Sequence, residues 1–485
     1  MPIQVPPPPL VTSALNVGID AFATVRAAVA AGIADARASF ELALRAPGDD
    51  WGFLVLAGVE PLLDALERLR PRVDEMEWLE HVGAIDGPTR RRLIESRFTC
   101  DVDAAPEGSV VFPGEAVLTV EGPYWQAQMV AGMVQAAISD ATAVATRFAR
   151  LSLASHGVLL VEDGAATAHR LGGTPLLARA AHVGGARATT SAVAARRYSI
   201  PVATFEPARF DLAVDDPDRA LRAWLTAAPP GSAVRVEPSR AAGTLRRLAA
   251  AVRDRKRASG ASWDERHVTV ELPSGDRAGL ARMAVTAFED AGLDPPRIVV
   301  SGDVDERLVL SLRADGVPLH GFVVRADGVP GTRHLARYEL VAIEKGGAWS
   351  PRMRAGEDGA SSSEPGRKLL VRFSDDAGHP VADVAHGSGE RLLRAQGGRY
   401  VDRLTGLTVK LDAATGAPLR VAALRAGKRA TQQEPPSSLR DRARAAVQAL
   451  AEKHRRIGSP ARYPIGLSPQ LAALRTELLE DGDDR

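Results

Sequence analysis

The chain has 485 residues, of which 45% are hydrophobic and 25% are charged, and its formal net charge is +1. This composition is typical of a soluble globular protein with two or three domains, and it gives no electrostatic case for nucleic acid or an anionic membrane. The single cysteine, Cys100, excludes a disulfide framework and a cysteine-based metal cluster.

The N-terminal third is predicted to be mainly helical. The opening MPIQVPPPPLV lacks the basic and apolar regions of a signal peptide. Residues 19–45 have helical character, and residues 54–98 contain a run of helices in which Leu62, Leu63, Leu66 and Leu69 form one apolar face. The apolar stretch 53–63 is far shorter than the roughly 20 residues that a membrane span needs. We therefore expect a cytoplasmic protein.

Strands and helices alternate through the middle of the chain. Residues 98–120 are predicted to form strands and residues 124–153 a long helix. From about 157 to 343, short apolar runs alternate with helical segments, which favours a parallel sheet or an α/β barrel. Residues 345–367 are typical of a loop, 368–424 return to strands, and 438–456 form a charged helix.

Generic catalytic signatures are absent from the sequence. There is no GxSxG, P-loop, GxGxxG or HExxH pattern, and the ten histidines include no pair at ligand spacing. We therefore predict no metal site built on histidine or cysteine.

Several stretches together resemble the nicotinate phosphoribosyltransferase family. They include RFTCDVDAAPEGSVVFPGEAVLTVEGPYWQAQMV (97–130), ARAAHVGGARATTSAVAARRYSIPV (178–202), ELPSGD (271–276), VVSGDVDE (299–306) and PGRKLLVRF (365–373). The resemblance implies an irregular α/β barrel beside an α/β sandwich domain built from N- and C-terminal segments, and a homodimer with sites near its interface. On this basis we expect a sandwich segment at 1–133, the barrel at 134–345, a second sandwich segment at 346–427, and a linker with a charged helix at 428–485.

The resemblance also implies a reaction. Family members make nicotinate mononucleotide from nicotinate and phosphoribosyl pyrophosphate with Mg²⁺, and ATP hydrolysis through a phosphohistidine drives it. Both substrates are anions, so the site needs arginines, exposed backbone amides and carboxylates for the metal ion.

The family's substrate-binding positions are mostly substituted here. The motif with the ring-stacking tyrosine aligns with TSALNVG, where Leu15 stands, and the carboxylate-binding arginines become Ala166 and Thr167. The phosphorylated histidine becomes Ala208. In the RLDSGD motif, Glu271 replaces the arginine and Pro273 the first aspartate, and VVRA at 323–326 replaces the phosphate-binding GVGT. Five separate elements fail together, so we predict no catalytic residues and an impaired or inactive site.

Other positions of the family motifs are retained. They are Arg179, Gly184, Gly185, Thr189, Ser274, Gly275, Asp276, Ser301, Gly302 and Asp303. One interpretation is scaffold, with glycines in turns and Ser or Asp capping helices. The other is a remaining polar binding rim, in which Gly184, Gly185 and Thr189 hold a phosphate.

Five basic residues beside the substituted motifs could form a new anion site. They are His169, Arg170, Arg187, Arg209 and Arg325. In a chain with 55 arginines, the alternative interpretation is a set of solvated surface charges.

Three hypotheses for function stay open. The first is a catalytically inactive family member that binds a small anionic phosphosugar or nucleotide, or regulates an active paralogue. The second is an enzyme that transfers a phosphoribosyl or glycosyl group with another substrate. The third is a working nicotinate phosphoribosyltransferase in NAD salvage, for which Mg²⁺, phosphoribosyl pyrophosphate and ATP would be needed.

Overall fold

The structure is a computed structural model that describes residues 17–164, 174–206, 210, 213–259, 268–326, 335–354, 363–390, 398–411 and 415–483. These residues form two compact units. Residues 147–326 make up one, the barrel unit, and residues 17–146 together with 335–483 make up the other, the sandwich unit.

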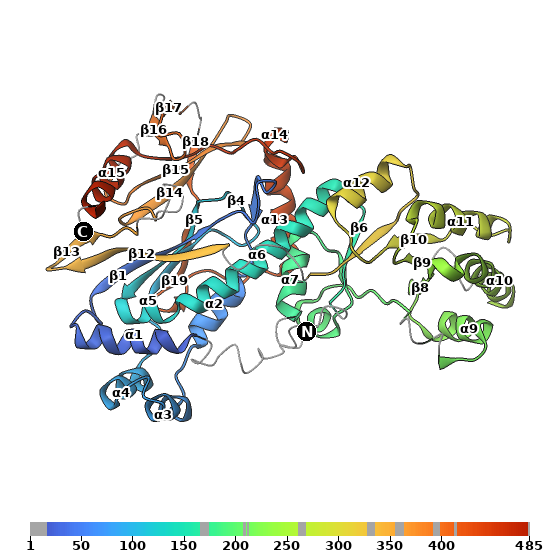
Figure 1. Cartoon of the computed structure of the whole chain (residues 1–485), viewed down its shortest axis with the longest axis horizontal. Coiled ribbons are helices and arrows are strands. Elements are labelled where there is room, and N and C mark those ends of the chain that lie inside the picture. Colours follow the sequence, from blue (N-terminus) through green and yellow to red (C-terminus); the bar gives the residue numbers. More distant parts are fainter. Residues whose placement is uncertain are drawn as a thin grey trace. The chain divides into compact units, whose positions relative to one another are not determined.

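The barrel unit is built around six parallel strands (Figure 1). In sheet order they are β7 (Ala188–Thr189), β6 (Leu159–Glu162), β11 (Gly321–Val324), β10 (Arg297–Val300), β9 (Thr269–Leu272) and β8 (Ala233–Arg235). Isolated parallel bridges pair Thr189 with Val202 and Phe205 with Ala233, so the chain at 202–205 connects the two edge strands. The sheet therefore curves into a barrel, which confirms the predicted fold class.

Helices connect the barrel strands, as the alternating pattern predicts. They are α7 (Thr174–Gly184), α8 (Ala192–Tyr198), α9 (Pro217–Ala227), η3 (Pro238–Arg240), α10 (Ala241–Ser259), α11 (Arg277–Glu289) and α12 (Glu306–Ala314). The long helix α6 (Ala131–Ala154) enters this unit at Arg147. Val161, Ala233, Val299 and Val323 form an apolar cluster on one face of the sheet, against which Phe205 packs. Since alternate residues face opposite sides of a strand, these positions fix which side chains line the barrel.

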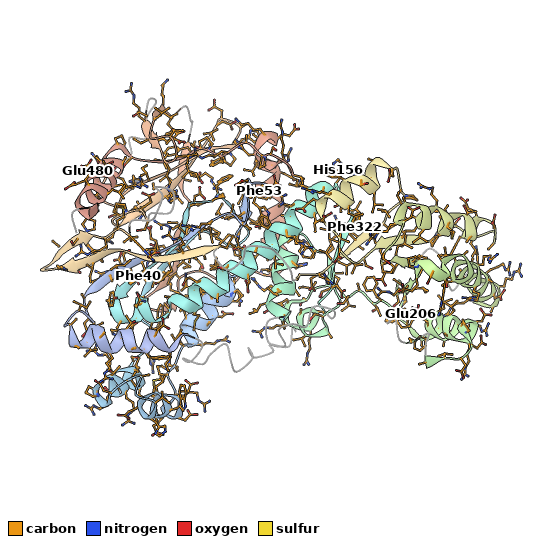
Figure 2. All side chains as sticks on the ribbon, viewed as in Figure 1. Phe40, Phe53, His156, Glu206, Phe322 and Glu480 are labelled. Carbon is orange, nitrogen blue, oxygen red and sulfur yellow. The ribbon has the colours of Figure 1, made fainter. Side chains whose placement is uncertain are left out.

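A seven-stranded antiparallel sheet forms the main layer of the sandwich unit (Figure 1). Its order is β13 (Ala348–Pro351), β12 (Ala336–Lys345), β1 (Arg37–Leu44), β5 (Ala116–Pro123), β3 (Asp101–Ala104), β19 (Val421–Arg425) and β20 (Lys428–Arg429). Its core joins residues from both ends of the chain, as the sandwich architecture requires. Phe40 and Phe53 lie in this unit, and Phe322 lies in the barrel unit (Figure 2).

A second sheet of six strands completes the sandwich unit. Its order is β17 (Thr408–Lys410), β16 (Arg399–Asp402), β21 (Ile465–Leu467), β15 (Pro380–Gly387), β14 (Lys368–Ser374) and β18 (Thr415–Pro418). A separate pair joins β2 (Leu54–Val55) to β4 (Val110–Val111). The helices of this unit are α1 (Ile19–Ala30), α2 (Val59–Arg68), α3 (Val73–His81), α4 (Gly87–Glu95), α5 (Tyr124–Met129), α13 (Pro436–Ala449), α14 (Glu452–Arg455) and α15 (Pro469–Asp483).

The predicted helix at 19–45 is wrong in its second half. Helix α1 ends at Ala30, and residues 37–44 form β1. This strand pairs with β5 on one side and β12 on the other, so both its edges are hydrogen-bonded. Long-range pairing therefore outweighs the local helical preference of an alanine-rich segment. The predicted apolar face of α2 is present, with Leu62, Leu63 and Leu66 buried.

Two segments belong to a different part of the fold from the one that their predicted domain ranges imply. Strand β12, within the range expected for the barrel, pairs with β1 in the sandwich unit. Strand β21, within the expected C-terminal tail, pairs with β15 and β16. In the described residues, no helix has the length and apolar character needed to cross a membrane.

Candidate functional site

The candidate site lies at the carboxyl ends of the barrel strands. Because parallel strands end at the same rim of a barrel, residues just after different strands come together there. Glu162 ends β6 and Thr189 ends β7 in register with it, while Glu271 lies one residue before the end of β9 and Ser301 directly after β10. The three motif stretches therefore come together at this rim, at residues 162–164, 271–276 and 299–306.

Glu162 is a buried carboxyl group held by its neighbouring strand. The Thr189 hydroxyl donates to Glu162 Oε2 over 2.5 Å, and the Ser191 amide donates to the same hydroxyl oxygen over 3.0 Å. Burial raises the pKa of Glu162 to about 7, with Asp163 adding to the rise and the Thr189 hydrogen bond opposing it. Among the described residues, its other oxygen, Oε1, has no hydrogen-bond partner. Glu162 can therefore hold or release a proton near neutral pH.

Glu271 is a second buried carboxyl group on this rim. The Ser301 hydroxyl donates to Glu271 Oε1 over 2.6 Å, and Arg235 Nη1 lies 3.6 Å from the same oxygen. Burial raises the pKa of Glu271; Ser301 and Arg235 oppose the rise, and the charges of Asp163 and Glu237 add to it. Arg235 is itself shared, because its Nε contacts Glu237 over 2.9 Å. The rim therefore gathers more carboxylates than cations around Glu271.

The retained turn residues make local contacts within the strand-end turns. Asp276 caps α11 by accepting from the Gly279 amide over 2.9 Å. Arg277 Nη2 donates to the carbonyls of Pro273 and Ser301, which ties the two strand-end turns together. Ser274 and Gly275 form the turn after β9, where Gly275 has a φ of +79°. These contacts are local, and they favour the scaffold interpretation of the turn residues.

The residues suggested for phosphate binding do not converge. Gly184 ends α7, and Gly185 and Arg187 lie before β7, where Arg187 donates to the Gly157 carbonyl ahead of β6. Thr189 lies at the opposite, carboxyl end of β7. Arg179 is buried in α7 and lies over the Tyr198 ring at 5.8 Å.

The five basic residues proposed as a new anion site are only partly described. Arg325 follows β11 at the carboxyl rim and donates to Asp303 over 3.1 Å, whereas Arg187 lies at the amino ends of β6 and β7. The structure therefore does not bring these two arginines together. His169, Arg170 and Arg209 lie outside the described residues, as do Leu15, Ala166, Thr167 and Ala208.

The acidic character of this rim is not evident from the motifs taken residue by residue. Asp163, Arg235 and Glu237 take part in it, and none of them is among the predicted site residues. Their position in the sequence is the signal that could have found them, since each lies in a predicted apolar run or within two residues after one. Within the described ranges, no three His, Cys, Asp or Glu side chains are arranged to hold a metal ion.

Comparisons with known proteins agree with the motifs. Residues 21–139 match the model of the nicotinate phosphoribosyltransferase N-terminal domain, and residues 367–475 match that of the C-terminal domain. Nicotinate phosphoribosyltransferase pncB1 of Mycobacterium tuberculosis is 30% identical over 375 residues, covering 75% of this chain and 79% of its own length. The human nicotinate phosphoribosyltransferase is 27% identical over 507 residues, covering 92% and 93%.

Solved structures share the fold of this chain. The crystal structure of human nicotinic acid phosphoribosyltransferase aligns with a TM-score of 0.74 at 22% identity, covering 95% of this chain and 99% of that one. The nicotinate-nucleotide pyrophosphorylase structure from Pyrococcus furiosus aligns with a TM-score of 0.66 at 16% identity, covering 93% and 98%. With the two domain matches and the 30% identity to pncB1, the chain belongs to the nicotinate phosphoribosyltransferase family.

Proposed function

We propose that this family member has lost nicotinate phosphoribosyl transfer and acts by binding or regulation. The function of the family is nicotinate phosphoribosyl transfer in NAD salvage, and the proposal concerns what this chain retains of it. The observation that carries the proposal is Glu271, which occupies the arginine position of the family's strand-end motif and is 4% exposed.

Glu271 cannot replace an arginine in binding an anion. A guanidinium offers five donors in a fixed plane, whereas a protonated carboxyl offers one and an ionised carboxyl none. Ionised Glu271 would repel a phosphate, and the nearby charges of Asp163 and Glu237 would add to the repulsion. Its cation neighbour, Arg235, is engaged by Glu237 and by Glu271 itself.

The alternative of a transferase for a different phosphosugar has weaker support. It requires new arginines to gather at the rim, and Arg187 and Arg325 lie at opposite ends of the barrel strands. Arg325 is also paired with Asp303, whose negative charge opposes the approach of an anion. The binding or regulatory role therefore remains the better supported of the two.

A steady-state assay tests the proposal. The purified chain is incubated with nicotinate, phosphoribosyl pyrophosphate, Mg²⁺ and ATP, and nicotinate mononucleotide is measured by chromatography. We expect no product above the enzyme-free blank, because losing two or three charge-assisted contacts costs roughly 1.5–3 kcal/mol each and removes several powers of ten in rate.

The control is an active relative in the same buffer, and circular dichroism establishes that the chain is folded. Mononucleotide formation above the blank by the folded chain would overturn the proposal.

A further inference from the structure

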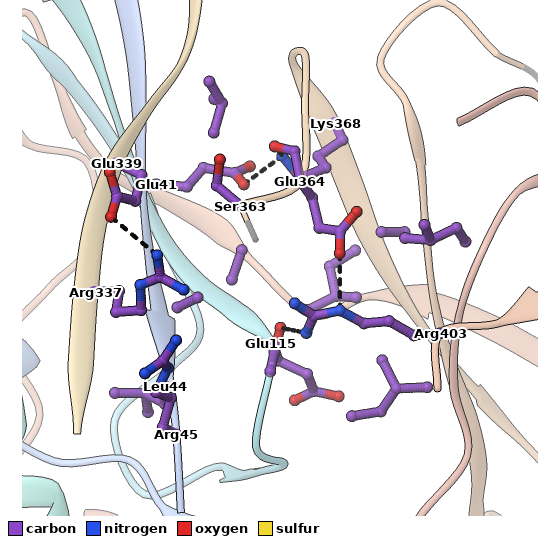
Figure 3. A pocket seen from close by; sticks show the side chains of 18 of the residues that line it. Glu41, Leu44, Arg45, Glu115, Arg337, Glu339, Ser363, Glu364, Lys368 and Arg403 are labelled. Carbon is purple, nitrogen blue, oxygen red and sulfur yellow. Dashed lines mark hydrogen bonds and ion pairs between the residues drawn. The ribbon is translucent and has the colours of Figure 1, made fainter. Parts of the chain in front are cut away.

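A pocket lies between the two sheets of the sandwich unit, apart from the barrel rim (Figure 3). Strands β1, β5 and β12 line it from the seven-stranded sheet, and β14, β15 and β21 from the six-stranded sheet. Its cavity volume is about 70 Å³, and the pocket is partly open to solvent.

The pocket combines an apolar wall with charged edges. Leu370, Ile465 and Leu467 line the apolar part, and each is less than 10% exposed. Arg337 and Arg45 lie on one side, Glu364 and Arg403 lie on the opposite side, and Glu41 and Lys368 close a third (Figure 3). A ligand that fits needs an apolar body and a charged end.

Three carboxylates of the wall are each shared by two cations. Lys368 and Arg420 share Glu41, at 2.6 and 2.9 Å, and Arg403 and Arg475 share Glu364, at 2.8 and 3.4 Å. Arg337 and Arg354 share Glu339, each at 3.4 Å. Four of these six cations line the pocket, namely Lys368, Arg420, Arg403 and Arg337, and Arg45 is a fifth, so five cations of the wall face these three carboxylates.

The fourth carboxyl group of the wall does not remove this excess. Burial raises the pKa of Glu115 well above its ordinary value, with Asp383 adding to the rise, so Glu115 favours its neutral form. The partly desolvated wall therefore has excess positive charge, which an anion would neutralise.

Arg337 is the cation best placed to take the anion. In the described part of the chain its side chain makes a single contact, the 3.4 Å approach to Glu339. Lys368 Nζ, by comparison, contacts Glu41 and the carbonyls of Glu364 and Gly366, and Arg403 contacts Glu364 and the Gly114 carbonyl. A guanidinium with most of its donors unused can donate two hydrogen bonds to one carboxylate in bidentate geometry.

We infer that this pocket binds a small monocarboxylate with an apolar body, whose carboxylate pairs with Arg337 while its body packs on Leu370, Ile465 and Leu467. The site is independent of the barrel rim and of any phosphoribosyl chemistry.

Isothermal titration calorimetry on the full chain tests this inference, with benzoate as the probe and benzamide as its uncharged match. We expect saturable benzoate binding and at least tenfold weaker benzamide binding. Arg337→Gln should weaken benzoate binding at least tenfold, which is the loss expected for one charge-assisted contact.

The matched control is Arg354→Gln. Arg354 contacts the same Glu339 oxygen at the same 3.4 Å, but it is 72% exposed and does not line the pocket. This variant should bind benzoate like the unmodified chain, and the thermal midpoints of both variants without ligand establish that they are folded. The inference fails if benzoate does not bind saturably up to about 10 mM, because a site with a dissociation constant near 1 mM would be largely occupied at that concentration. It also fails if benzamide binds equally well, or if Arg337→Gln binds like Arg354→Gln.

Discussion

Glu162 and Glu271 are single buried residues whose protonation is coupled to folding. Each accepts a hydroxyl hydrogen bond from the neighbouring strand, Thr189 to Glu162 and Ser301 to Glu271. Each also has one carboxyl oxygen with no hydrogen-bond partner in the part of the chain that the structure describes. Burial disfavours the charged form, so the folded state prefers these groups protonated.

This preference makes stability depend on pH through Glu162. Its folded pKa of about 7 lies above the unfolded value of about 4.3, so its stabilising contribution is complete below the unfolded pKa and is lost as pH rises through 7. We expect the unfolding free energy of the unmodified chain, relative to Glu162→Gln, to fall by roughly 2–3 kcal/mol between pH 5 and pH 8. Urea denaturation across that range measures it.

Glu289→Gln is the control, because Glu289 lies in the same unit at the exposed end of α11. The difference in unfolding free energy between this variant and the unmodified chain should be small, because an exposed side chain contributes little to stability. A Glu162→Gln difference that does not change with pH would contradict a buried, protonated Glu162.

At the scale of elements, the turn from β10 to α12 gives a structural reason for the glycine at position 302. Gly302 has a φ of +86°, and a Cβ atom there would lie 2.4 Å from the Pro273 carbonyl oxygen. Asp305 then caps α12 by accepting from the Leu308 amide over 2.7 Å. Turn conformation and close packing therefore explain these residues without a ligand.

Gly302→Ala should be more destabilising than an alanine at a left-handed glycine in open space. Gly316 supplies the comparison, since its φ is +65° and a Cβ atom at this position would have no neighbouring atom within 4 Å. We expect Gly316→Ala to cost roughly 1–2 kcal/mol from backbone conformation alone. Gly302→Ala should cost at least about 1 kcal/mol more, because overpacking forces the strand ends apart. Equal losses in urea denaturation would show that the Pro273 contact carries no cost.

Element types could be predicted from the sequence where local pattern and tertiary pairing agree. The strand and helix alternation from 157 to 343 predicts the barrel, and the leucine face of α2 is buried. Strand β1 was not predictable in this way, because its partners β5 and β12 lie as far as 300 residues away. The motif positions locate the rim, but the carboxylate pairing around Glu271 depends on contacts between β8, β9 and β10.

At the scale of the whole molecule, buried charges join distant parts of the sandwich unit. Glu41 in β1 pairs with Lys368 in β14 and with Arg420, and all three side chains are at most 5% exposed. Arg420 also donates to the Thr119 hydroxyl in β5 and to the Lys368 carbonyl. The segment around Lys368 stands out in sequence by its family motif, but its partner lies more than 300 residues earlier. The network can therefore be recognised only from the three-dimensional structure.

Removing the Glu41 carboxylate should lower the unfolding free energy of the whole sandwich unit. Glu41→Gln leaves Lys368 and Arg420 buried without their counter-ion, and burial already lowers the pKa of Lys368. Breaking one partner of a buried ion pair costs roughly 3–5 kcal/mol, because the remaining charge stays desolvated. Asp74→Asn is the control, since the Arg72–Asp74 pair is 67% exposed on each side and its loss should not change stability measurably. Denaturation followed by far-ultraviolet circular dichroism measures both variants. If Glu41→Gln were as stable as Asp74→Asn, water or a rearranged partner would have to neutralise the two cations, and the network would not hold the sheets together.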